Sequence, residues 1–241
     1  MEVRAISDPQ RAPVHALRAQ IERAQGRRLD ASALPVLPAL APLLPGGGLR
    51  LGSAYALESS AALTTAVMAG PSQAGSWCAA VGMPELGAEA GERAGVALDR
   101  LVLVPEPGPR WLAVVATLVE VVPVVAVRPP GRARDGDVAR LGARLRDRGA
   151  VLLVQGPWPQ AEASLCLSEP AWIGLGRGHG LLSRREVTVT AASRRWPVPR
   201  SARVALPGRD GAVAAVAEGS RGLERMRPGS EPVELERMVA G

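Results

Sequence analysis

The sequence contains no lysine, no asparagine and no phenylalanine, and it has only one tyrosine. All 29 basic residues are therefore arginines, and with 23 acidic residues the formal net charge is +6 at pH 7. Without lysine, the chain lacks the ammonium group with which phosphate-binding loops hold a nucleotide. With so few aromatic rings, it offers little on which unpaired bases could stack. Contacts with nucleic acid, if the chain makes them, are therefore expected between arginine and phosphate.

Cysteine and histidine are also scarce. Cys78 and Cys166 lie far apart in apolar stretches, and His15 and His179 are the only histidines, so no structural zinc cluster is expected. We expect buried, reduced thiols in a cytosolic protein. The N-terminal ten residues are polar, which argues against a signal peptide. A glutamate and a proline interrupt the apolar run 111–127, so no membrane span is expected.

Apolar residues make up 47% of the chain, enough for a core built mainly from valine, leucine and alanine. Short apolar runs alternate with helical patterns, which is typical of parallel strands joined by crossover helices. For the last of these helices, an aspartate is the expected N-cap and Gly149 the expected C-cap. Strands are predicted at 53–57, 77–81, 101–104, 124–127 and 151–154, and helices near 61–70, 85–95, 110–121 and 137–148.

The two ends of the chain differ from this alternating part. Residues 13–29 have apolar residues at helical spacing and predict an amphipathic helix, and the Pro- and Gly-rich stretch 33–49 predicts a linker. Residues 164–167 and 186–190 flank the segment GLGRGHG and predict a β-ribbon. Beyond it, three prolines and no clear period predict an irregular basic tail, which ends in a short helical pattern at 233–240. The expected units are residues 1–45, 46–192 and 193–241.

The connection between the first predicted strand and helix resembles the phosphate loop of RecA-type recombinases. Gly47–Leu49 match the Gly-Gly-Leu run that precedes the strand in that family. Glu58–Ser60 match the Glu-Ser-Ser of the loop, and Thr64 matches its last threonine. The resemblance, which extends to about residue 191, implies an α/β fold with a RecA-like, mostly parallel sheet. Helices would flank that sheet, which would end in the β-ribbon.

The departures from that loop remove its chemistry. Ala56 and Ala61 stand at the two loop glycines, Ala62 at the lysine, and Leu63 at the hydroxyl that binds Mg²⁺. Strand 124–127 runs into Arg128 where the family has a metal-orienting aspartate. Either the loop merely connects a strand to a helix, which we favour, or some nucleotide binding remains. We expect no enzyme activity, cofactor or metal; the degenerate loop comprises Glu58, Ser59, Ser60, Ala61, Ala62, Leu63 and Thr64.

The stretches ESSAALTT, ALDRLVLVPEPGPRWLAV and GLGRGHGLLSRREVTVT are together similar to the ImuA-prime branch of bacterial ImuA proteins. This resemblance implies an accessory factor of the SOS response, located in the cytoplasm at the nucleoid. Its implied partners are an ImuB-type inactive Y-family polymerase homologue and an error-prone C-family DNA polymerase in mutagenic translesion synthesis. RecA filaments and DNA are further candidates. Two alternatives are a RecA paralogue with residual DNA-dependent ATPase activity and a SulA-like cell-division inhibitor.

Arginine-rich segments supply the candidate contact surfaces. The segment after strand 124–127 is either a solvated helix face or a surface for DNA or an acidic partner. The ribbon tip is either a plain turn or a contact loop, and the tail is either disordered or docks on a partner through Trp and Arg anchors. The expected contact residues are Arg132, Arg134, Arg140 and Arg144 in the first segment, Arg177 in the second, and Arg194, Arg195, Trp196, Arg200 and Arg203 in the tail.

Overall fold

The structure is a computed structural model that describes residues 33–174 and 182–216. Nine of the described strands form one sheet in the order β11-β10-β9-β8-β3-β7-β6-β4-β5, and β1 and β2 form a separate pair. Three sequence predictions lie outside the described residues. They are the amphipathic helix at 13–29, the ribbon tip with Arg177 and His179, and the helical pattern at 233–240.

The parallel half of the sheet confirms the strands predicted from the aliphatic runs, to within one residue at their ends. Such runs form central strands because helices cover both faces of the sheet and leave no polar face. β8, which follows this half, pairs in parallel with β3. The strands are β3 (Ala54–Leu57), β4 (Cys78–Val81), β5 (Leu101–Val104), β6 (Val124–Val127), β7 (Val151–Gln155) and β8 (Ala163–Ile173).

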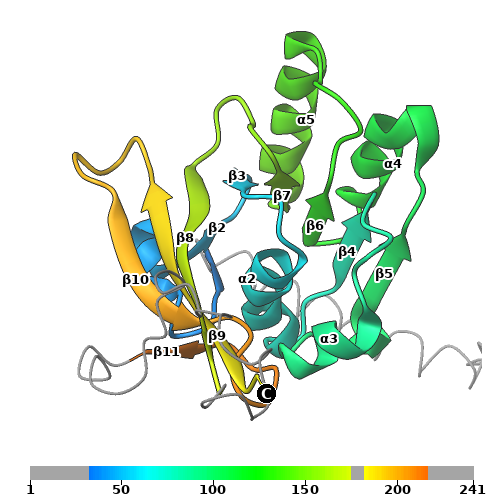
Figure 1. Cartoon of the computed structure of the whole chain (residues 1–241). Coiled ribbons are helices and arrows are strands. Elements are labelled where there is room, and N and C mark those ends of the chain that lie inside the picture. Colours follow the sequence, from blue (N-terminus) through cyan, green and yellow to red (C-terminus); the bar gives the residue numbers. More distant parts are fainter. Residues whose placement is uncertain (1–32, 175–181, 217–241) are drawn as a thin grey trace, which may run out of the picture.

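Helices cover the sheet on two sides, as Figure 1 shows. α2 (Ala61–Gln73) packs with the β1–β2 pair and one face of the sheet in the larger core, near α3 (Ala88–Arg93). α4 (Trp111–Leu118) and α5 (Asp135–Arg148) pack on the other face, where Trp111 and Val115 meet Leu141, Leu145 and the strand valines. The described part therefore has three layers, helix–sheet–helix. None of the described helices has the length and apolar character needed to span a bilayer.

The two ends of α5 test the predicted capping residues, an aspartate at the N-terminus and Gly149 at the C-terminus. Gly149 adopts a left-handed conformation with φ of 63° and ends the helix, as predicted. The N-cap prediction is wrong, because Arg134 occupies that position with extended backbone and makes no side-chain cap bond. Asp135 and Asp137 lie inside the first turn, where their charges favour the positive end of the helix dipole.

The stretch 33–49 is not a linker. β1 (Ala33–Pro35) pairs antiparallel with β2 (Gly48–Arg50), and two 3₁₀ turns, Ala41–Leu43 and Pro45–Gly47, lie between them. Leucines between and within these short elements are almost completely buried against α2 and the sheet. The prolines break the stretch into short pieces, which hides any period, while the leucines fill the core.

The C-terminal prediction is half right. β8 and β9 (Arg184–Ala192) form the predicted antiparallel ribbon. The expected irregular tail is wrong for part of its length, because β10 (Arg200–Ala205) pairs with β9, and β11 (Ala214–Ala215) pairs with β10. The sequence of β10 is mostly arginine, serine and alanine, so it carries little strand propensity, and β9 supplies the template.

The thiols differ from each other. Cys78 on β4 is buried, as expected for a small residue within a central strand. Cys166 on β8 is exposed, so the expectation of two buried thiols is wrong for this residue. β8 alternates between buried and exposed positions, and Cys166 falls on the outward side between Leu165 and Leu167.

Tyr55, the single tyrosine, gives a direct optical test of the core. Its ring is fully buried, its hydroxyl accepts a hydrogen bond from the Arg50 N–H at 2.8 Å, and burial raises its pKa to about 12. We expect tyrosinate absorbance to appear near pH 12 in the folded protein and near pH ~10 in the unfolded chain. The stability that the neutral ring contributes is complete below pH ~10 and is lost as the pH rises towards 12. A folded-state midpoint near 10 would contradict this packing.

Candidate functional site

The carboxyl ends of the central strands are the place where open α/β sheets usually bind ligands. β3, β7 and β6 are neighbours in the sheet and run in the same direction. α2 begins directly after β3 and lies on one face, whereas α5 follows β6 and lies on the other. The connections that follow β3 and β6 therefore run to opposite faces of the sheet. The degenerate loop, which joins β3 to α2, lies at the carboxyl ends of these strands.

The loop from Glu58 to Ser60 is tied to its surroundings. The Ser60 side chain accepts a hydrogen bond from the Leu63 N–H at 3.2 Å and caps α2, and the Thr64 hydroxyl donates to the Ser60 carbonyl at 2.9 Å. A Glu58 carboxylate oxygen accepts from the Leu167 N–H of β8 at 2.6 Å. The loop is therefore held by α2 and β8 of the same chain.

The first turn of α2 presents methyl groups. Ala61 and Ala62 are partly exposed, and Leu63 is completely buried in the core. Their carbonyls do not remain free, since the Thr65 hydroxyl lies 3.0 Å from the oxygens of both alanines. At these three positions, which correspond to glycine, lysine and a hydroxyl in the resembled loop, no side chain can hold a phosphate or a metal ion.

Arg128 and Gln155 link the strand ends in front of that loop. The Arg128 Nε donates to the Gln155 Oε1 at 2.8 Å, and the Gln155 Nε2 donates to the Thr64 Oγ1 at 2.8 Å. The Ser59 hydroxyl lies 3.4 Å from the same Gln155 oxygen. Arg128 also forms an ion pair with Glu85, and this hydrogen-bonded guanidinium holds the pKa of the Glu85 carboxyl below its ordinary value. We call these five residues the edge network.

The edge network joins α2 and the loop before it to the end of β6, to β7 and to the loop after β4 through this chain's own polar groups. Gln155 is only 5% exposed, so its amide would be costly to bury without these partners. Sequence reasoning found Arg128 but missed Gln155. Its signal was present, because Gln155 is the one polar residue that ends the aliphatic strand Val-Leu-Leu-Val-Gln. Chemically, the network is suited to fix the edge, since its side chains already bond to one another.

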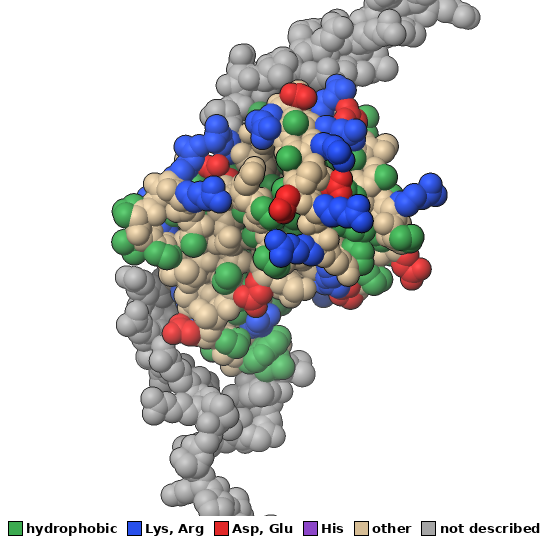
Figure 2. Space-filling view, turned by 90° about the horizontal axis from the view of Figure 1, so that it is seen from above, with side chains coloured by type: hydrophobic (Ala, Val, Ile, Leu, Met, Phe, Trp, Pro, Cys, Tyr) green, Lys and Arg blue, Asp and Glu red, His purple; other side chains and the backbone are tan. Residues whose placement is uncertain are grey.

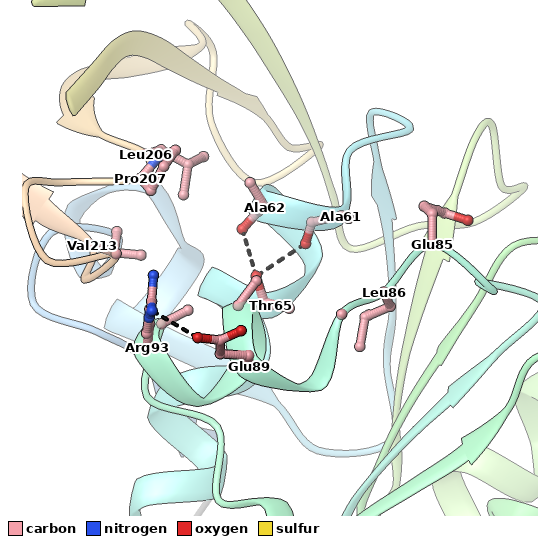
Figure 3. A pocket seen from close by; sticks show the side chains of 14 residues that line it. Ala61, Ala62, Thr65, Glu85, Leu86, Glu89, Arg93, Leu206, Pro207 and Val213 are labelled. Atoms are coloured by element: carbon pink, nitrogen blue, oxygen red, sulfur yellow. Dashed lines mark hydrogen bonds and ion pairs between the residues drawn. The ribbon is translucent and has the colours of Figure 1, made fainter. Parts of the chain in front are cut away.

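Two hollows flank the edge network. Figure 3 shows the larger, of about 400 Å³, between the start of α2, α3 and the chain around Leu206 and Val213. Its walls are mainly aliphatic, and the Glu89 carboxylate within it accepts a hydrogen bond from Arg93 at 2.7 Å. The smaller hollow, of about 290 Å³, lies beside Arg128 and is lined by five prolines: Pro105, Pro107, Pro109, Pro129 and Pro130.

The arginine-rich segment forms a mixed surface. Arg132 and Arg134 are exposed in the loop before α5, and Arg144 is exposed on the helix. Arg140 pairs with Asp137 at 3.1 Å. α5 carries four arginines and three aspartates, a balance of +1. Figure 2, which looks down on the end of the molecule over which α5 rises in Figure 1, shows arginines interspersed with acidic side chains.

The residues expected to form a partner-binding tail mostly make contacts within the chain. Arg195 pairs with Glu162, and Trp196 packs against the larger core with the Arg200 guanidinium 4.1 Å from its ring centre. Arg203 donates to the Glu169 carbonyl at 2.6 Å. Arg194 is exposed. These contacts give the side chains structural roles, and partner binding by them stays a prediction.

The fold and the site define a mixed α/β protein with a large, mostly parallel sheet, a filled carboxyl edge and antiparallel strands towards the C-terminus. Residues 42–160 match the family described as the MT3502 N-terminal domain. Over 120 residues, or 48% of the chain, the sequence is 33% identical to the uncharacterized protein Rv3395c of Mycobacterium tuberculosis (strain ATCC 25618 / H37Rv). The chain spans 59% of that relative's length. The family match contains the whole edge network and ends before β8.

Proposed function

We propose that this chain is a non-catalytic, RecA-like adaptor of the ImuA type that acts in DNA-damage-induced mutagenic translesion synthesis. The observation that supports a non-catalytic role most strongly is the edge network. Arg128 and Gln155 bond across the strand ends where a nucleotide and its metal would need free ligands. A protein without such ligands acts by binding other macromolecules.

The energetic argument rests on several losses at one place. Loss of a single preorganised donor typically lowers a catalytic rate about a hundred- to a thousandfold. In this chain the lysine, the metal-binding hydroxyl and the metal-orienting carboxylate are replaced by Ala62, Leu63 and Arg128. Arg128 could attract a phosphate by its charge, but Glu85 already balances it. Residual ATPase activity is therefore disfavoured.

An ImuB-type inactive Y-family polymerase homologue is the proposed direct partner, and an error-prone C-family polymerase joins through it. Support comes from the resemblance of the sequence and from the positive net charge of +6. Arg132, Arg134 and Arg144 are exposed, and within the described residues no carboxylate pairs with them. Such arginines are available to an acidic protein surface or to DNA phosphates.

Co-purification after DNA damage tests this proposal. We expect the full chain to capture an ImuB-type partner, and we expect a chain that ends at Val216 to lose most of that capture while it unfolds at the same temperature. The shortened chain lacks residues 217–241, which hold four arginines, Arg221, Arg225 and Arg227 among them, and five glutamates, but it keeps every described strand. The variant Arg209→Ala, on an exposed turn, is the matched control and should capture normally.

Three other outcomes discriminate among the alternatives. Capture of cell-division proteins in place of polymerase homologues would favour the hypothesis that the chain is a SulA-like cell-division inhibitor. No specific capture by the full chain would reject the adaptor. Equal capture by the full and shortened chains would place the interface elsewhere, and Arg132→Glu together with Arg134→Glu would then test the loop before α5.

A further inference from the structure

The sheet has two edges that differ in their protection. At one end, the short β11 covers part of β10, whose first two residues, Arg200 and Ser201, are exposed. At the other end lies β5, which pairs only with β4. Natural proteins protect edge strands with charges, prolines or bulges. β5 reads Leu-Val-Leu-Val and has none of these within the strand.

Exposed apolar side chains surround β5, which forms the rim of the sheet in Figure 1. Leu103 in the strand is 41% exposed, Leu98 just before the strand is 38% exposed, and Trp77 just before the neighbouring β4 is 46% exposed. Single exposed apolar residues are ordinary, but three of them beside an open strand edge are typical of a contact surface. No described strand pairs with this side of β5.

The backbone of β5 shows which groups an incoming strand would meet. The Val104 carbonyl accepts from the Gly82 N–H at 2.9 Å, so Val104 faces inward towards β4. Because successive residues of a strand direct their N–H and C=O groups to opposite sides, Leu103 and Leu101 face outward. The Leu101 N–H is already bonded to the Leu98 carbonyl. Leu103 therefore offers both an outward donor and an outward acceptor.

We propose that β5 pairs antiparallel with β5 of a second copy of this chain, with the twofold axis at Leu103. Leu103 then exchanges two hydrogen bonds with the partner's Leu103, and Val102 faces the partner's Val104. Leu101 faces the partner's Pro105, which has no N–H to satisfy, while the Leu101 N–H keeps its own bond. This register leaves no backbone donor of β5 unpaired.

The charges at the two ends of β5 favour a second copy as the occupant. Arg100 precedes the strand and Glu106 follows it. Antiparallel pairing about Leu103 brings Arg100 to the partner's Glu106, and the twofold axis repeats this contact. Because the backbone groups of β5 alternate between inward and outward, the register between the two copies can shift only by two residues. Each such shift moves Arg100 away from the partner's Glu106. Asp99 lies 3.7 Å from Arg100, and its side chain is 75% exposed, so it remains in solvent.

Sedimentation equilibrium of the full chain tests the proposal. The proposed contact consists of one four-residue strand from each copy, and so small an interface binds weakly. The apparent mass should therefore rise from 25.0 kDa towards twice that value as the protein concentration approaches about 100 µM. Leu103→Arg places two like charges on the axis and should weaken the dimer at least about tenfold. Val198→Arg is the matched control, because Val198 is 68% exposed and lies in the loop before β10.

A charge exchange tests the orientation of the pairing. Arg100→Glu and Glu106→Arg should each weaken the dimer by about tenfold, and the two together should restore it. A chain that stays monomeric over this range would overturn the proposal. Weakening of the dimer by Val198→Arg as much as by Leu103→Arg would overturn it as well. A dimer that Leu103→Arg weakens but the double exchange does not restore would reject the twofold antiparallel arrangement.

Discussion

A chain that ends at Ser193 is expected to lose its cooperative fold. The deletion removes β10 and β11, in which Val204 and the adjoining Leu206 are almost fully buried. It also uncovers one side of Val187 and Val189 on β9. Complete burial of one such aliphatic side chain stabilises a protein by about 1.5–3 kcal/mol. The summed loss, on the order of 5 kcal/mol or more, reaches the range of a whole domain's stability.

Circular dichroism during thermal unfolding measures this effect. A chain that ends at Val216 retains all described strands and should show a cooperative transition. The chain that ends at Ser193 should aggregate or unfold without one. A cooperative transition of the Ser193 chain at the temperature of the Val216 chain would mean that β10 and β11 are not part of the core.

Gly70→Ala is expected to destabilise the protein by about 2–4 kcal/mol. A Cβ at position 70 of α2 would lie 2.4 Å from the Val36 Cα and 2.7 Å from the Pro35 carbonyl oxygen. These are backbone atoms, and the segment cannot easily retreat because Leu37 and Leu40 are buried beside it. The substitution therefore tests whether residues 33–49 are part of the core.

Gly142→Ala in α5 is the matched control. The nearest atom to its Cβ is the end of the flexible Arg146 side chain, at 3.6 Å. An alanine within an exposed helix should stabilise by about 0.5–1 kcal/mol, because it restricts the unfolded chain and favours the helix. Denaturant unfolding should thus show changes of opposite sign. A neutral Gly70→Ala would show that the segment does not touch α2 closely.

The sequence predicted the parallel half of the sheet well, because short continuous runs of Val and Leu that alternate with helical patterns are typical of buried parallel strands. The sequence-based prediction was wrong for segments whose structure depends on contacts with residues far away in the sequence. Leu40 and Leu43 lie among prolines and look like part of a linker until α2 is placed against them. β10 is a strand because β9 pairs with it, not because its residues prefer that conformation.

The candidate site, like the fold, could be predicted only in part from the sequence. That Ala61 and Ala62 offer no side chain to bind a phosphate follows from residue types alone, as does the positive charge of Arg128. The role of Gln155 does not, because it depends on β7 lying between β3 and β6. Only that neighbourhood brings the Gln155 amide to Thr64 on one side and to Arg128 on the other.

Because of the edge network, we expect that placing the glycine and the lysine of a phosphate loop at positions 61 and 62 does not produce ATPase activity. Ala61→Gly together with Ala62→Lys returns a flexible loop and an ammonium group. It leaves Arg128 bonded to Gln155 at the position where the RecA-type recombinases that the sequence resembles have a metal-orienting aspartate. We expect no turnover of ATP by this double variant, and hydrolysis above the background rate would contradict that expectation.

Calorimetric titration of the full chain with Mg²⁺ and ATP tests the central claim most directly. If the edge network fills the carboxyl end of the sheet, no binding in the micromolar range should be detected, and the thermal unfolding temperature should not rise with nucleotide. A micromolar dissociation constant for ATP at one site per chain would contradict the claim.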